Sequence, residues 1–381
     1  MHNKTFEGFS FLSFGLALAA MAVSACSGGD LPMVGPEDES ALTGLCQEIQ
    51  ADLVAAAAKD AIPALTDPEL VAVDDLRAEF LLPTDRVIGI EVDGQYIAIP
   101  HNILWWHEIV NFNEYGLAVT YCPLTGSSMV FQRASVDGDE FGVSGLLFNN
   151  NLVMYNRTPL GVEETLWPQM LAGGRCGPAS GTELAMSPSL EIEWADWVAL
   201  HPDTRVVGGD TGFPRDYRLY PYGNYEVETN SITLVPQDDL DRRRPPKERV
   251  LGIPFGGGGG IAFPFGALRS VGDLAAIHTI LGDGQEEAGG IDPVVVFWSS
   301  AAAAAMAFTP SLAGKDLTFE VRNGAFVDVE TGSQWSLDGK ALSGPLAGES
   351  LLKIRDAYVS FWFAFATFFP DPVLWTPATS S

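Results

Sequence analysis

Hydrophobic and polar residues alternate over short stretches from residue 86 onward. The segments 87–92 and 96–99 flank Asp93-Gly94, a pair typical of tight hairpin turns. Similar Asp-Gly pairs follow at 137–138 and 338–339, and the chain holds 40 Gly and 25 Pro. The pattern predicts a β-rich α+β fold of many short strands and turns with a few helices.

Three segments depart from the strand pattern. Residues 45–62 are rich in Ala with helical spacing, and Pro63 marks the expected end of that helix. Residues 103–112 predict a short helix on which His107 and Asn111, four apart, would share one face. Residues 361–369 are strongly apolar, but they are too few for the roughly 18 residues of a membrane span. We therefore expect them to form a core element.

The first 25 residues have the organisation of a secretory signal. Lys4 precedes an apolar run at 11–25, and Val23-Ser24-Ala25 places small side chains immediately before Cys26. The ending resembles a lipobox, in which the cysteine thiol is acylated and becomes the new N-terminus. A secretory signal followed by a chance cysteine is the alternative.

Residues 26–41 are rich in Gly, Pro and acidic residues and predict a flexible tether between membrane and domain. Ser27 stands where an Asp would retain many lipoproteins in the inner membrane. We therefore expect a bacterial envelope protein anchored by lipid in the outer membrane and facing the periplasm.

Charge and composition limit the possible partners. The formal net charge of −28 opposes binding to nucleic acid or anionic headgroups. The 22 Phe and 9 Trp exclude a disordered chain. The expected partners are thus the membrane, through the lipid alone, and a small ligand of unknown identity.

Two parts of the chain resemble each other in sequence. Residues 96–100 match 260–264, residues 117–122 match 293–298, and a Trp followed by a Gly-Pro-x-x-Gly segment occurs in both. The repeats span about 75–236 and 248–372 and predict two homologous halves packed as a pseudo-symmetric pair. The corresponding domains are 42–240, which includes the N-terminal helical segment, and 241–381, a degenerate copy.

The candidate chemistry lies in the first half alone. In the sequence comparison Cys122 stands opposite Trp298 and His107 opposite Val271. Cys122 should lie at the end of a strand, where a rigid scaffold commonly presents a reactive group. Because Cys122 and His107 have no counterpart in the second half, a functional role fits them better than a structural role that both halves would need.

Long blocks of the chain closely resemble bacterial domain-of-unknown-function family 3179. The blocks are WHEIVN, TYCPLTGSSMVF, FGVSGLLFNNNLVMY, WVALHP and TGFPRDYRLYPYGNY, and the similarity covers about 63–372. The resemblance implies membership without an established activity. It marks as motif positions His107, Glu108, Asn111, Tyr121, Cys122, Trp167, His201, Arg215, Asp216 and Tyr217.

The resemblance also bears on the cysteines. Four are present, at 26, 46, 122 and 176, and a lipidated Cys26 leaves three in an oxidising compartment. If Cys122, as the motif cysteine, stays reduced or ligand-bound, Cys46 and Cys176 remain as the candidate disulfide.

Three functions fit these residues. In the first, Cys122 and His107 hold a soft metal or haem in a binding module, with Asn111, Tyr121, Arg215, Asp216 and Tyr217 as ligand-binding residues. In the second, His107 activates the Cys122 thiolate of an enzyme, and Glu108 or Asn111 orients the imidazole. In the third, the protein is an envelope scaffold without chemistry.

Overall fold

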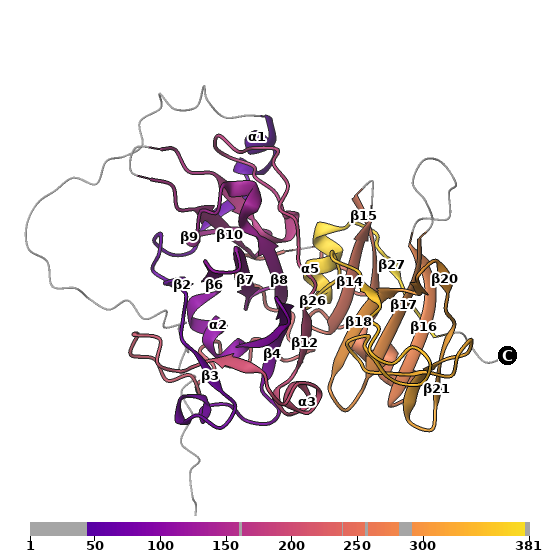
Figure 1. Ribbon diagram of the computed structural model, residues 1–381. Coiled ribbons are helices and arrows are strands. Elements are labelled where there is room, and N and C mark those ends of the chain that lie inside the picture. Colours follow the sequence, from indigo (N-terminus) through magenta and orange to yellow (C-terminus); the bar gives the residue numbers. More distant parts are fainter. Residues whose placement is uncertain (1–43, 160–161, 238, 256–257, 282–291, 378–381) are drawn as a thin grey trace, which may run out of the picture. The chain divides into compact units, whose positions relative to one another are not determined.

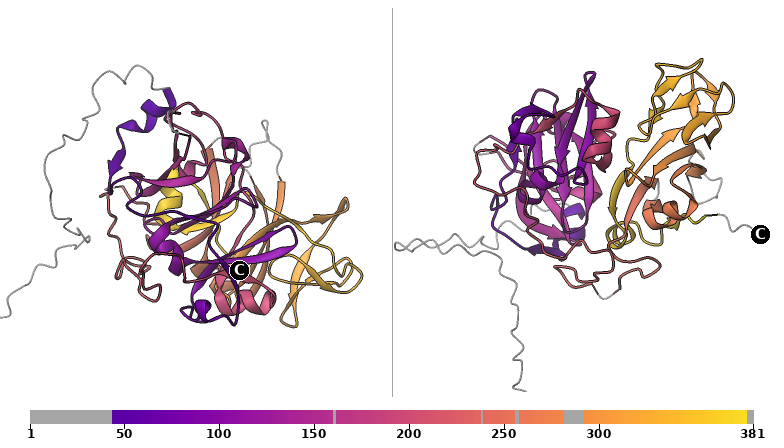
Figure 2. Two further views of the ribbon diagram at one scale, coloured as in Figure 1. Left: turned by 60° about the vertical axis from the view of Figure 1, so that its left-hand side comes forward. Right: turned by 90° about the horizontal axis from the view of Figure 1, so that it is seen from below.

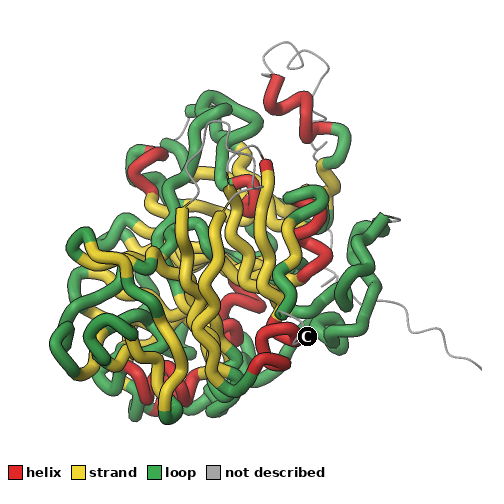
Figure 3. The backbone as a smooth tube through the Cα atoms, turned by 90° about the vertical axis from the view of Figure 1, so that its right-hand side faces the viewer, coloured by secondary structure: helices red, strands yellow, loops and turns green. Residues whose placement is uncertain are grey.

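The fold was analysed in a computed structural model that describes residues 44–159, 162–237, 239–255, 258–281 and 292–377. The signal segment 1–25, Cys26 and the tether 26–41 lie outside the described residues. Strands predominate and the helices are short (Figures 1 and 3), which confirms the predicted β-rich class with few helices. Within the described residues no helix has the length and apolar character needed to cross a membrane.

The first sheet is built around the predicted hairpin. Asp93 and Gly94 both have positive φ, as a two-residue type I′ turn requires. The helices α2 (His101–His107) and α3 (Trp194–Leu200) directly follow two of its strands. The strand order is β12 (Leu190–Glu193), β4 (Arg86–Val92), β5 (Gln95–Pro100), β13 (Arg205–Val207) and β3 (Leu70–Ala72).

Two further sheets complete this part of the chain. One has the order β2 (Leu65–Thr66), β6 (Ile109–Phe112), β7 (Leu117–Cys122) and β8 (Ser127–Gln132). The other has the order β1 (Leu53–Ala55), β9 (Phe141–Phe148), β10 (Asn151–Asn156) and β11 (Leu166–Pro168). Three 3-10 turns accompany them: η2 (Leu76–Ala78), η3 (Arg133–Val136) and η4 (Gln169–Leu171).

The remaining strands follow residue 248. The first sheet there is β26 (Tyr358–Phe361), β14 (Arg249–Phe255), β15 (Gly259–Pro264) and β27 (Val373–Leu374), with α4 (Phe265–Val271) after β15 and α5 (Trp362–Phe368) after β26. The second is β16 (Leu274–Leu281), β17 (Asp292–Ser299), β18 (Ala304–Thr309) and β25 (Leu352–Lys353). The others are β21 (Phe319–Arg322), β22 (Ala325–Asp328), β23 (Gln334–Trp335) and β24 (Ala341–Ser343), and the pair β19 (Ser311–Leu312) and β20 (Lys315–Asp316).

Two predicted helices are shorter than expected. Helix α1 (Gly44–Gln50) ends well before Pro63, because residues 53–55 pair with β9 as strand β1. The second helix ends at His107, and the β-branched residues after Glu108 continue as β6, paired with β7. His107 and Asn111 therefore do not share a helix face. In both cases sheet pairing overrides local helix propensity.

The strand bounds offer a second way to align Cys122 with the later part of the chain. Four residues separate β7 from β8, and four separate β17 from β18. Counting from these turns places Ser299 opposite Cys122 and Trp298 opposite Tyr121. Val271 is about half exposed and so fills no buried space equivalent to that of His107.

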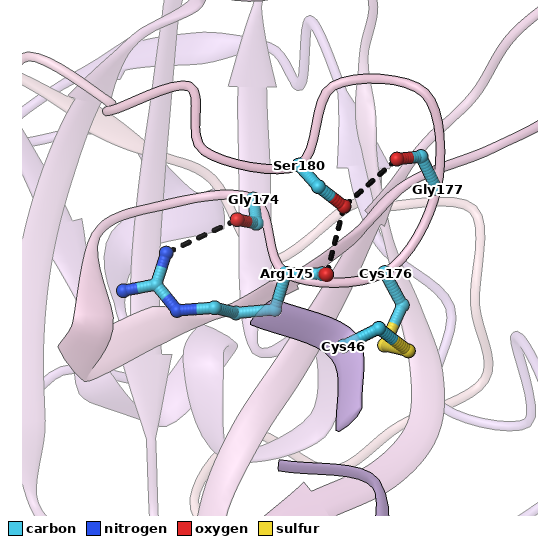
Figure 4. The surroundings of a disulfide bond; sticks show 6 residues. All are labelled: Cys46, Gly174, Arg175, Cys176, Gly177 and Ser180. Atoms are coloured by element: carbon cyan, nitrogen blue, oxygen red, sulfur yellow. Dashed lines mark hydrogen bonds between the residues drawn. A yellow bond between two sulfur atoms is a disulfide. The ribbon is translucent and has the colours of Figure 1, made fainter. Parts of the chain in front are cut away.

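A disulfide joins Cys46 of α1 to Cys176, with their Cα atoms 4.5 Å apart (Figure 4). Cys176 lies in a turn fastened by Ser180, whose hydroxyl donates to the carbonyls of Arg175 and Gly177 at 2.7 and 2.8 Å. The bond therefore attaches the start of the described chain to a rigid turn 130 residues later.

Reduction of this disulfide should lower the free energy of unfolding. A loop of 130 residues gives a stabilisation of about 4–5 kcal/mol on the chain-entropy model. Urea unfolding of wild type and Cys176→Ala, with and without reductant, measures the effect. The reductant should destabilise wild type alone; equal midpoints for all samples would contradict the expectation.

Candidate functional site

Cys122 ends strand β7 in the core. It is 1% exposed, and its thiol donates to the Asn150 carbonyl across 3.7 Å. Among the described cysteines it is the free one. It packs in a cluster that includes Leu124 of the following turn, Phe361 at the end of β26 and Trp362 at the start of α5.

The surroundings of the Cys122 sulfur shift the pKa of its thiol in two opposite directions. Burial raises the pKa of the Cys122 thiol to about 11, and the negative charge of Glu108 adds to this rise. The hydroxyl and backbone N–H of Thr125 and the N–H of Leu152 favour the thiolate and partly offset it. At neutral pH the sulfur is thus a protonated thiol with anion-stabilising donors around it.

A buried hydrogen-bond network fixes the turn after Cys122. Asn151 of β10 donates its side-chain amide to the Thr125 hydroxyl at 3.0 Å and to the Gln169 side-chain oxygen at 2.8 Å. Gln169 donates to the Thr120 hydroxyl at 2.8 Å and accepts from Ser127 at 2.6 Å. All five side chains are fully buried. A satisfied polar network of this kind specifies one geometry for the turn.

Glu108 is the most unusual residue near the thiol. Its φ of 57° places a non-glycine residue in the left-handed region, at a cost of about 1–3 kcal/mol. It is 7% exposed, and its pKa is shifted by burial alone, without a contribution from a hydrogen bond of a described residue. Burial raises its pKa to about 8. A strained, buried and unpartnered acid is typical of a functional position.

His107 has a different set of partners. Its Nδ1 lies 2.8 Å from the Pro63 carbonyl, and its Nε2 lies 2.7 Å from the Tyr217 hydroxyl. A carbonyl can only accept, so Nδ1 carries the proton. Burial lowers the pKa of His107 to about 4, so the ring is neutral and Nε2 accepts from Tyr217. Both nitrogens are occupied, and neither is free for the Cys122 proton.

The other motif residues divide between structure and surface. Asn111 bonds across strands, donating to the Leu65 and Phe141 carbonyls and accepting from Phe141 N–H. Tyr121 is buried against the His101 ring at 4.1 Å, and its hydroxyl has no partner among the described residues. Arg215 and Asp216 are exposed, and the Arg215 guanidinium lies 5.2 Å from the Trp106 ring.

His201 belongs to another cluster. Its ring stacks on Tyr96 at 3.6 Å, and its Nε2 lies 3.3 Å from the Asp338 carboxylate. Trp167 is buried and donates its indole N–H to the Asn156 side chain at 3.0 Å. These two motif residues therefore have structural partners of their own.

A long irregular stretch passes over Cys122. Residues 208–248 contain no helix or strand where described, and they form the pink to salmon loop in the right-hand view of Figure 2. The Tyr225 hydroxyl donates to the Leu124 carbonyl at 2.9 Å, and Tyr222 donates to the Trp105 carbonyl at 3.4 Å. Both tyrosines pack against the Cys122 cluster. Loops of this length commonly carry function.

Sequence reasoning did not identify Tyr225 or the network residues Thr125, Asn151 and Gln169 as parts of the site. Tyr225 ends the TGFPRDYRLYPYGNY block. Asn151 stands in the FGVSGLLFNNNLVMY block, and Gln169 follows the motif residue Trp167 by two positions. Their position within long motif blocks was the available signal, but their convergence depends on the pairing of β7, β8 and β10 with η4.

Metal ligation by Cys122 and His107 lacks further ligands in the described chain. No group of three or more His, Cys, Asp and Glu side chains within it could hold a metal ion. Glu108 and Cys122 interact electrostatically, but the nitrogens of His107 are bound elsewhere.

The comparisons assign the class of the chain. Residues 59–372 match the family described as Protein of unknown function (DUF3179). The protein belongs to this family, as the sequence blocks predicted. No curated protein and no solved structure matches the chain.

Replacement of Glu108 by Gln should change how stability depends on pH. The folded pKa of about 8 exceeds the ordinary value of 4.5, so protonation of Glu108 favours the folded state. This contribution is complete below pH 4.5 and is lost as the pH rises to about 8. At one pKa unit per 1.36 kcal/mol, its loss is at most about 5 kcal/mol.

Urea unfolding of wild type between pH 4.5 and 8.5 should therefore show a decline that Glu108→Gln lacks. Glu114→Gln, an exposed change in the turn after β6, should keep the wild-type profile. Parallel profiles for wild type and Glu108→Gln would contradict the burial of an unpartnered acid.

Proposed function

We propose that this protein is a lipid-anchored envelope protein that binds a small ligand at Cys122 and Glu108, beneath residues 208–248. The observation that carries the proposal is Glu108, a nearly buried carboxyl group at a positive φ, whose pKa burial raises with no hydrogen bond to offset the rise. A buried polar group without a partner is costly. A ligand that supplies a donor or a positive charge would remove this cost.

The ligand chemistry follows from the groups that face the site. At neutral pH these are a thiol, a protonated carboxyl group and the hydroxyl-bearing rings of Tyr222 and Tyr225. A ligand with a hydrogen-bonding or cationic group and an apolar body suits such a set. Soft metal or haem ligated by Cys122 and His107 is less favoured, because His107 would have to break both of its hydrogen bonds.

A thiol-dependent enzyme is the second candidate. The donors from Thr125 and Leu152 would stabilise a Cys122 thiolate formed during a reaction. In this alternative the ionised carboxylate of Glu108, rather than His107, would receive the proton of the Cys122 thiol. An interaction scaffold without chemistry is the third candidate. It accounts for the positive φ of Glu108, which is the C-cap of α2, but it gives the buried carboxyl group no role.

The envelope address rests on the sequence. The Val-Ser-Ala-Cys ending at Cys26 favours acylation, and Ser27 favours the outer membrane facing the periplasm. Two or three acyl chains would anchor the protein stably.

We further propose that residues 42–240 and 241–381 hold two homologous repeats, packed as a pseudo-symmetric pair. The orders β12-β4-β5-β13 and β26-β14-β15-β27 support this, since both contain the same antiparallel and parallel pairings. Trp167 and Trp335 donate their indole N–H groups to Asn156 and Asp328, both at 3.0 Å.

The ligand proposal predicts a bound mass in protein from its native membrane. Native mass spectrometry of wild type should show a mass above that of the acylated chain. The double variant Glu108→Gln, Cys122→Ser should lack this mass, whereas Glu114→Gln should keep it. An equal added mass in all three proteins, or none in wild type, would contradict a ligand at this site. A colour or a bound metal in wild type would favour the metal alternative.

The anchor proposal predicts a processing defect. Cys26→Ala removes the acylated thiol, so the variant should remain a larger precursor in whole-cell blots. Wild type should fractionate with the outer membrane. Release of a mature, unacylated form from Cys26→Ala would exclude lipidation, and inner-membrane wild type would exclude the location.

A further inference from the structure

We propose that His107 is a positioning residue that holds residues 208–237 closed over Cys122. The reason for closing the loop rests on the proposed function, whereas the contacts of His107 that hold the loop do not depend on it. It gives His107 a role other than metal ligation or proton transfer.

A chain of hydrogen bonds fastens the loop through His107. The Thr211 hydroxyl lies 2.5 Å from the Tyr217 hydroxyl, which in turn lies 2.7 Å from His107 Nε2. Because Tyr217 donates to the neutral ring, Thr211 donates to Tyr217. The opposite ring nitrogen donates to the Pro63 carbonyl at 2.8 Å. The imidazole therefore links the loop to the segment that precedes β2.

Tyr217 is the anchor of the loop at this end. It is 4% exposed, whereas residues 212–216 on one side and 218–219 on the other are exposed. Its backbone carbonyl accepts from the buried Asn102 amide at 2.9 Å, and its ring contacts Phe80 at 5.8 Å. Within this exposed run Arg218 donates to the Glu79 carbonyl at 3.2 Å and the Arg215 guanidinium lies 5.2 Å from the Trp106 ring, so the buried His107 contact holds the loop together with two exposed ones.

The same loop reaches Cys122 only a few residues later. Tyr222 and Tyr225 pack on the Cys122 cluster, and Tyr225 bonds to the turn that follows the cysteine. Farther on, Val235 exchanges two hydrogen bonds with the Asn150 side chain, at 2.6 and 2.9 Å. The Asn150 carbonyl is also the acceptor of the Cys122 thiol. Release at Tyr217 would free the tyrosines while Val235 still holds the far end.

The rate at which iodoacetamide alkylates Cys122 in the folded protein reports opening of the loop. Tyr217→Phe removes the donated hydroxyl but keeps the ring, and His107→Phe removes both ring nitrogens. Each should raise the alkylation rate at zero denaturant by about ten-fold to a hundred-fold, as expected for loss of a buried hydrogen bond. His107→Gln can still donate and accept, and should stay near the wild-type rate. The double variant should be no faster than the faster single variant.

Urea dependence separates local opening from global unfolding. Alkylation through loop opening should change little at low urea, whereas alkylation through unfolding should rise steeply with urea. Val296→Ala, in the buried strand β17, is the matched control, because it should weaken the fold and leave the urea-free rate unchanged.

Wild-type rates in Tyr217→Phe and His107→Phe would overturn the inference, as would a rate increase that follows global stability alone. Tyr217→Phe keeps the test decisive if His107→Phe fails to fold. The assay contains no ligand, so a negative result leaves the ligand proposal standing. Conversely, if no ligand binds, His107 should still hold the loop closed, and the two proposals can therefore fail separately.

Discussion

The fold depends on one buried carboxylate, Glu191 of β12, which joins the two sets of sheets. Its Oε1 lies 2.6 Å from Arg86 of β4 and 3.2 Å from Arg249 of β14, and its other oxygen accepts from Ser128 of β8. Arg86 also donates to the Ala303 carbonyl in the turn before β18. Burial opposes ionisation of Glu191, yet the charges of Arg86 and Arg249 hold its pKa well below the usual range. Removal of one partner from such a cluster typically costs about 3–5 kcal/mol, because a buried charge is left unpaired.

The candidate site is built outward from this junction. Ser128 fixes β8 beside Glu191, and the preceding residue, Ser127, belongs to the network that sets the turn after Cys122. The pairing of β6 with β7 then brings Glu108 next to the thiol, since its carbonyl accepts from Tyr121 N–H at 2.8 Å. The rigid sheets thus present two buried acidic groups, the Cys122 thiol and the Glu108 carboxyl group. The irregular loop that covers them is the element whose position can change. This division between fixed groups and a removable cover is common in ligand-binding proteins.

Local sequence signals predicted the elements that depend on turn chemistry and alternation. The hairpin at Asp93-Gly94 and the strand that ends at Cys122 are in this class. The helices at 45–62 and 103–112 were overestimated, because pairing with β9 and β7 decides those segments. Sequence also marked His107, Glu108 and Cys122 as motif positions, but their division of roles was not predictable. It depends on Pro63 and Tyr217, which lie 44 and 110 residues from His107.

The titration of Glu108 tests the central claim most directly. Carboxyl ¹³C NMR of protein with labelled glutamate, with the signal assigned through Glu108→Gln, gives the pKa of this group in the ligand-free protein. A buried acid without a donor should titrate near pH 8. Saturation with a ligand that supplies a donor or positive charge should lower this pKa. Titration of Glu108 near its ordinary value of 4.5 in the ligand-free protein would contradict the account.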